Sequence, residues 1–228
     1  MTIVDDMIGI VHTYYPRGMA RDDPGYEESA EHRRLVAARR QAGKENEAWR
    51  TLLRRLGEQF PATSVLDDSL HLSTGSLDAA YSGNVFLSPS LTVGFLVSFL
   101  VPYYVLYSAR VVEDRQVRPP AGGPTRVIFA GSTCYVLPAW AAKLATLFLG
   151  ATASPLADDA PPKQTVVAFE FSSEEQSCAA LLTQEIEAIW GFERMPPAVG
   201  KIIVPDVATD NRGLGEATLY DCLFAEFA

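Results

Sequence analysis

The stretch LTVGFLVSFLVPYYVLYSARVV, residues 91–112, decides how this chain folds. Most of it is apolar, but Pro102 interrupts it, and it is rich in Val, Phe and Tyr, which favour strands. The apolar run ends at Tyr107 and is shorter than the roughly 20 residues that cross a bilayer as a helix. The stretch therefore predicts two consecutive buried strands, 91–100 and 103–112, with a turn at Pro102, and no membrane span.

Helical patterns precede these strands. Residues 26–43 have acidic side chains first, basic ones later and Gly43 at the end, which is typical of a helix. Apolar side chains then recur at helical spacing from Trp49 to Phe60. The two segments predict a helix hairpin joined near Gly43.

Shorter elements are expected in the rest of the chain. After Pro61, apolar pieces bounded by Asp67-Asp68, Gly75 and Gly83 indicate short strands and turns. Further strands are predicted at 126–130, 165–171, 201–204 and 217–224. Helices are predicted over 137–148, with Pro138 in the first turn, and after a capping box of Ser172 and Glu175.

This order of elements favours the α+β class, with a largely antiparallel sheet flanked by the N-terminal helix hairpin and two later helices. Clusters of Pro and Gly at 16–25, 118–124 and 154–162 indicate loops. Their spacing favours a single domain over residues 1–228, with sub-layers at 1–60 and 61–228.

Charge is distributed unevenly along the 228 residues, whose formal net charge is −9. Residues 1–60 carry 10 Lys and Arg against 10 Asp and Glu, whereas the other 168 carry 9 against 18. An acidic body suits a basic partner and repels the phosphates of nucleic acid. Arginines between His32 and Arg55 are the one basic feature, and nearby glutamates are expected to neutralise much of it through i to i+4 pairs.

The cysteine usage and the N-terminus indicate a cytoplasmic protein. Cys134, Cys178 and Cys222 are far apart and odd in number, which favours reduced thiols over a disulfide framework. The N-terminal segment has no basic region and no small-residue cleavage site, so no secretory signal is expected.

The sequence contains no complete signature of a catalytic or metal site. His12, His32 and His71 stand far apart, without zinc-type spacing. Ser132 and Cys134 lie between a predicted strand and a predicted helix, where a nucleophile could be held, but the Gly-x-Ser-x-Gly pattern is missing. We therefore expect no enzyme activity, no cofactor and no metal.

Acidic and aromatic residues occur together near the C-terminus. Carboxylates steer the encounter with a basic protein, and aromatic side chains hold the complex. The predicted partner-binding residues are Asp67, Asp68, Asp206, Asp210, Glu216, Tyr220 and Asp221.

Several of these segments resemble a family of immunity proteins from bacterial polymorphic-toxin and type VI secretion systems, whose toxins are nucleases of the restriction-endonuclease fold. The resemblance covers most of the chain and lies in packing residues. The matching stretches are 14–18 (YYPRG), 32–34 (HRR) with Trp49 downstream, 69–72 (SLHL), 204–209 (VPDVAT) and 219–224 (LYDCLF).

The resemblance implies an α+β protein without catalytic activity that binds and neutralises a cognate nuclease toxin in the producing cell. It also implies that Trp49, with Arg33 or Arg34, has a structural or binding role. No nucleic acid and no membrane is expected as a partner. Whether inhibition blocks the toxin's active site or disturbs its assembly stays open, as does the oligomeric state.

Two other functions also stay open. One is a hydrolase or transferase with a site near Ser132 and Cys134, and the other is an adaptor protein without a toxin partner.

Overall fold

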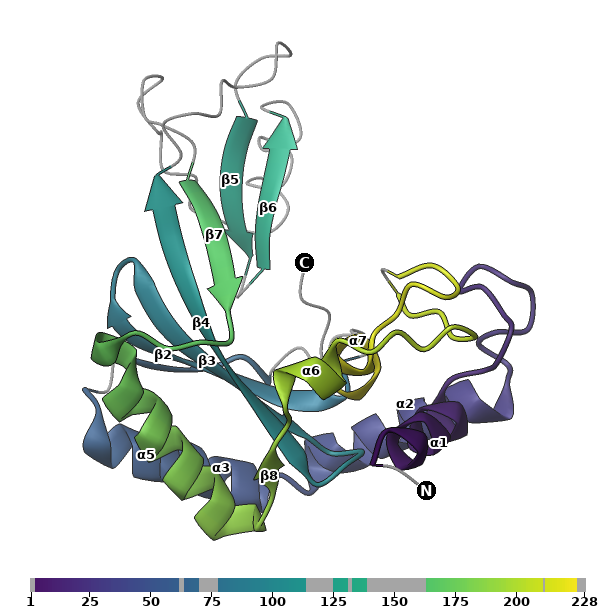
Figure 1. The fold of residues 1–228 in the computed structure, drawn as a ribbon, viewed down its shortest axis with the longest axis horizontal. Coiled ribbons are helices and arrows are strands. Elements are labelled where there is room, and N and C mark those ends of the chain that lie inside the picture. The colour runs from purple at the N-terminus through teal and green to yellow at the C-terminus, as the bar shows by residue number, and fades with distance from the viewer. Residues whose placement is uncertain are drawn as a thin grey trace. The chain divides into compact units, whose positions relative to one another are not determined.

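A mostly antiparallel sheet with helices on both faces forms the centre of the fold, which confirms the α+β prediction (Figure 1). The computed structural model describes residues 3–61, 64–69, 78–113, 125–130, 133–138, 163–210 and 212–224. By internal contacts the chain divides into two compact units, Met1–Ala109 with Val167–Ala228, and Arg110–Val166. The single domain expected over residues 1–228 stays a prediction.

The central strands of the sheet are those that the longest apolar run predicts. β3 spans Leu91–Ser98 and β4 spans Tyr103–Glu113, with Pro102 between them. The strand order is β1-β2-β3-β4-β7, with β8 pairing parallel to β4. The other strands of this sheet are β1 (Val65–Asp67), β2 (Ala80–Ser88), β7 (Lys163–Ala168) and β8 (Glu193–Arg194).

β2 runs through Gly83, where the sequence pattern predicts the end of a segment. Gly83 pairs with Phe95 on β3, and the Phe95 ring lies directly over the glycine, where a Cβ atom would collide with it. This glycine is therefore a packing residue inside a strand, and the expected boundary there is wrong.

The predicted N-terminal helix hairpin is confirmed as α2 (Ala30–Lys44) and α3 (Glu47–Gln59). Ser29 caps α2, its hydroxyl accepting from the His32 backbone N–H at 3.1 Å. An earlier helix, α1 (Ile3–Tyr14), packs against α2 and was not expected. Its acidic first turn and its two buried residues, Met7 and Val11, four positions apart, are the sequence signal for it.

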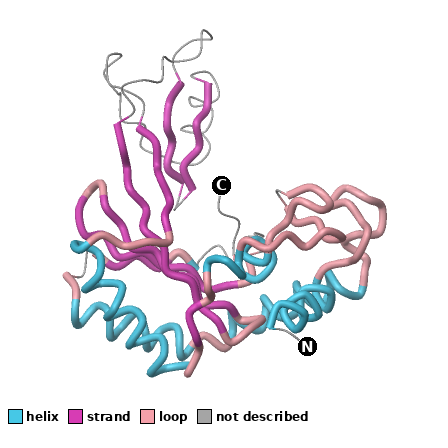
Figure 2. The backbone as a smooth tube through the Cα atoms, viewed as in Figure 1, coloured by secondary structure: helices cyan, strands magenta, loops and turns pink. Residues whose placement is uncertain are grey.

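The two faces of the sheet carry separate cores. On one face, Phe95 and other strand residues pack with Trp49 and Leu52 of α3 and with Leu182 of α5 (Ser173–Trp190). On the other face, Leu96 packs with residues of α1, α2 and α7 (Leu219–Leu223). The helices of each face are grouped together in the tube view (Figure 2). The capping box of Ser172 and Glu175 at the start of α5 is confirmed.

The C-terminal segment differs from the prediction of two strands at 201–204 and 217–224. The short helix α6 (Pro197–Gly200) precedes the first of these stretches, and they meet only in an isolated bridge, Ile203 with Thr218. Residues 219–223 then form α7, because Thr218 and Asp221 make a capping box that starts a helical turn. The predicted strands are wrong here.

The smaller unit contains a two-stranded antiparallel sheet of β5 (Thr125–Ala130) and β6 (Thr133–Pro138). β5 confirms the strand predicted at 126–130. The helix predicted from 137 is wrong at its start, since 137 and 138 pair within β6, and residues 139–148 lie outside the described residues. Within the described ranges no helix is long and apolar enough to span a membrane.

Candidate protein-binding surface

Two loops that are distant in the sequence lie side by side in the larger unit. Residues 15–29 connect α1 to α2, and residues 204–218 precede α7 (Figure 1). The Gly18 N–H donates to the Asp206 carbonyl at 2.8 Å, and the buried Tyr26 hydroxyl donates to the Ala208 carbonyl at 2.9 Å. We call the exposed face of these two loops the two-loop surface.

Asp206 ties the second loop to α1 and the first loop. Its carboxylate lies 2.9 Å from His12 Nε2 and accepts from Arg17 Nε at 2.7 Å. Partial burial acts to raise the pKa of Asp206, but the hydrogen bonds from His12 and Arg17 outweigh it and hold the pKa below its ordinary value. The carboxylate is therefore ionised and paired at neutral pH.

Arg21 makes the second link between the loops. Its Nε donates to Asp210 at 2.6 Å, and its guanidinium lies 4.8 Å from the centre of the Tyr26 ring. Burial raises the pKa of Tyr26 to about 12, so its hydroxyl stays a hydrogen-bond donor. These contacts hold both loops in one conformation before any partner arrives.

Carboxylates outnumber basic side chains on the two-loop surface. The exposed acidic residues are Asp22, Asp23, Glu27, Glu28, Asp210 and Glu216, whereas the basic residues of the two loops are Arg17, Arg21 and Arg212. An apolar side chain, Leu214, is 44 % exposed among them, and Ile203, just before the second loop, is 54 % exposed. An acidic surface with exposed apolar side chains suits a basic protein partner.

Three of the predicted partner-binding residues lie on this surface. They are Asp206, Asp210 and Glu216, and Glu216 also accepts from the Gly213 N–H at 3.1 Å. Tyr220 and Asp221 are only 4 % and 7 % exposed, so both side chains are buried in the protein and are not accessible to a partner. The Tyr220 ring stacks on Phe169. The Asp221 carboxylate accepts a hydrogen bond from the Thr218 hydroxyl at 2.6 Å and lies 3.6 Å from Arg212 Nε.

Asp67 and Asp68 lie elsewhere, at the β1 edge of the sheet. Asp67 accepts from Trp49 Nε1 at 3.1 Å, and Asp68 is 8 % exposed and accepts from the Asn84 amide. Trp49 also stacks on Tyr81 with ring centres 5.2 Å apart. The structure therefore gives Trp49 and Asp67 a packing role and does not bring the two aspartates to the two-loop surface.

The acidic residues of the first loop were missed from the sequence. Residues 1–60 have no net charge overall, so the charge distribution along the chain does not reveal an acidic cluster there. The cluster consists of Asp22, Asp23, Glu27 and Glu28. Their clustering around Pro24-Gly25, a turn signal, was the available clue that they lie on an exposed loop.

The residues of the catalytic alternative are described only in part. Cys134 pairs with Phe129 in the β5–β6 ladder, and Ser132 lies outside the described residues. In the part of the chain that the structure describes, no three His, Cys, Asp or Glu side chains are grouped to hold a metal.

Comparisons with protein-family models, with curated proteins and with solved structures find no match.

Proposed function

We propose that this chain is a non-enzymatic immunity protein that binds a nuclease toxin and neutralises it in the cytoplasm of the producing cell. The two-loop surface carries the proposal, because it gathers carboxylates from both ends of the chain and also includes the exposed Leu214. A nuclease needs basic side chains where it holds the phosphates of its substrate. A surface of this charge is complementary to that region of such an enzyme.

The fixed geometry of the loops supports tight binding. Asp206 and Asp210 are already paired across the loops, so the partner meets an ordered surface and binding costs little loop entropy. The exposed acids Asp22 and Glu28 would steer the encounter, while Leu214 would be buried in the complex. The resemblance of 204–209 to the immunity family lies in the second of these loops.

Co-expression tests the proposal directly. The chain is expressed with a candidate nuclease encoded by a neighbouring gene, and host survival and recovery of a complex by size-exclusion chromatography are measured. Survival with a stable complex is expected. Death of the host despite expression of the chain would refute immunity, and survival without a complex would refute stoichiometric inhibition.

Charge reversal locates the binding surface. Asp22→Lys with Glu28→Lys should weaken the complex about tenfold or more, since both carboxylates are exposed on the two-loop surface. Glu170→Lys with Glu193→Lys is the matched control, because these exposed carboxylates lie outside the two loops and the net charge changes equally. Equal weakening by both pairs would mean that overall charge, and not this surface, determines binding.

A further inference from the structure

A row of basic side chains runs along the solvent face of α2. Arg33, Arg40 and Lys44 are exposed and stand 7 and 4 residues apart, which places them on one side of the helix over about 16 Å. The opposite side carries the buried residues His32, Leu35, Arg39 and Ala42. We call the row of three the α2 basic stripe.

The stripe is not neutralised, contrary to the expectation from sequence. One expected pair forms, Arg34 with Glu31, and Arg54 pairs with Glu58. Neither Arg33 nor Arg40 has an acidic residue three or four positions away in α2. In the described part of the chain, none of the three stripe residues is in an ion pair.

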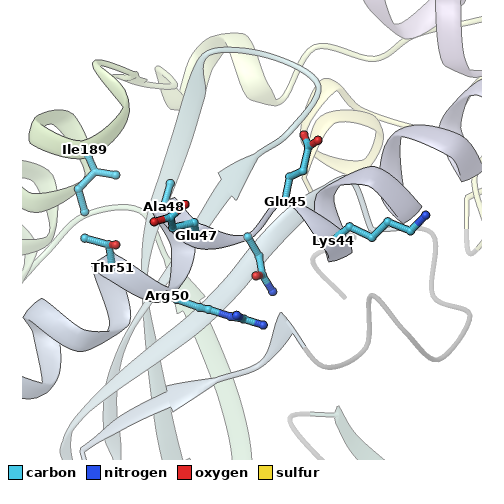
Figure 3. Close-up of a pocket in the computed structure, with 8 residues that line it drawn as sticks. Lys44, Glu45, Glu47, Ala48, Arg50, Thr51 and Ile189 are labelled. Carbon is cyan, nitrogen blue, oxygen red and sulfur yellow. The ribbon is translucent and has the colours of Figure 1, made fainter.

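A depression in the surface continues the stripe where α2 meets α3. Lys44 and Arg50 line it together with the polar side chains of Asn46 and Thr51, and Ile189 of α5 adds an apolar contact (Figure 3). Glu45 and Glu47 also border it. The depression therefore combines two cations and two carboxylates with neutral hydrogen-bonding groups and an apolar side chain, whereas the stripe itself is wholly basic.

We propose that the α2 basic stripe and this depression bind an acidic segment of a protein partner. Separate carboxylates of a peptide can reach Arg33, Arg40 and Lys44 individually, while Asn46 and Thr51 bond its backbone. A nucleic acid fits less well, because the regularly spaced phosphates of a duplex cannot turn away from Glu45 and Glu47, whereas the side chains of a flexible peptide can. This surface is distinct from the two-loop surface and does not depend on the proposed immunity function.

Binding of defined probes to the full chain tests the proposal. Fluorescence anisotropy at low ionic strength is measured with a labelled ten-residue oligoglutamate peptide and with a labelled 20-base-pair DNA duplex. Oligoglutamate is expected to bind, and Arg33→Glu with Arg40→Glu is expected to raise its dissociation constant about tenfold or more. The DNA duplex is expected to bind more weakly than the peptide.

The control pair is Arg54→Glu with Lys201→Glu, two exposed residues outside the stripe that change the net charge equally. Far-ultraviolet circular dichroism checks that both double variants are folded. If Arg33→Glu with Arg40→Glu does not fold, Arg33→Gln with Arg40→Gln replaces it. Absence of peptide binding, an equal loss in the control pair, or tighter binding of DNA would each overturn the proposal. None of these outcomes bears on rescue from the nuclease, so the two proposals fail separately.

Discussion

Asp206 is the residue whose chemistry most directly controls the two-loop surface. Since its pKa is lowered in the folded protein, it stabilises the fold above its unfolded pKa of about 3.9. That contribution disappears as the pH falls through the folded pKa. Asp206→Asn should therefore lower the free energy of unfolding by about 1 kcal/mol at pH 7 and by almost nothing near pH 2.

Urea unfolding at the two pH values measures this difference. Glu58→Gln is the control, because Glu58 and Arg54 form an exposed pair, 60 % and 65 % accessible, which should contribute little at either pH. An Asp206→Asn effect of the same size at both pH values would show that the carboxylate charge is not what stabilises the loops.

Gly83 makes a second prediction for a single residue. Gly83→Ala would place a methyl group against the Phe95 ring, which is fully buried, so the strand or the ring must shift. We expect a loss of about 1–3 kcal/mol in chemical unfolding. Gly57→Ala on α3, where nothing lies within 4 Å, should instead be neutral or stabilising by up to about 1 kcal/mol. Equal effects would contradict the close packing of Gly83.

Among the elements, α7 is, like α1, a helix that the sequence could have revealed. Thr218 and Asp221 have the same three-residue spacing as Ser172 and Glu175, which correctly predict the start of α5. The other residues of 219–224 are apolar or aromatic and obscured this signal, because all six residues are buried and a short buried helix has no polar face. The strands of 91–112 were predictable because their local pattern and burial agree.

Removal of the α7 cap should loosen the loop before it. Thr218→Ala deletes the hydroxyl that accepts from the Asp221 N–H and should cost about 1 kcal/mol of unfolding free energy. Hydrogen exchange of residues 205–216 should also accelerate, since Thr218 anchors the end of this loop. Thr13→Ala, which removes an exposed hydroxyl bonded within α1, is the control and should change neither. Unchanged exchange in Thr218→Ala would mean that the contacts with residues 15–29 order the loop without the cap.

At the scale of the whole molecule, only one of the two loops that form the candidate surface could be predicted from the sequence. The acids of 206–216 stand out as a local cluster, but their proximity to Asp22 and Glu28 depends on contacts across about 190 residues, such as Arg21 with Asp210. No local pattern encodes such contacts. Burial of Asp68 and Asp221 is equally a tertiary property, because in sequence a capping or buried carboxylate looks like a solvated one.

The charge of the whole chain makes a final prediction about rates. If carboxylates on the two-loop surface steer a basic nuclease, its association rate should fall about tenfold between 50 and 500 mM salt, while the dissociation rate changes much less. Stopped-flow fluorescence measures the first rate and a competition chase the second. In Asp22→Lys with Glu28→Lys, the salt dependence should become weaker, because two steering carboxylates are replaced by cations; in Glu170→Lys with Glu193→Lys it should persist. A salt-independent association rate in the unmodified chain would mean that Leu214 and shape, and not charge, select the partner.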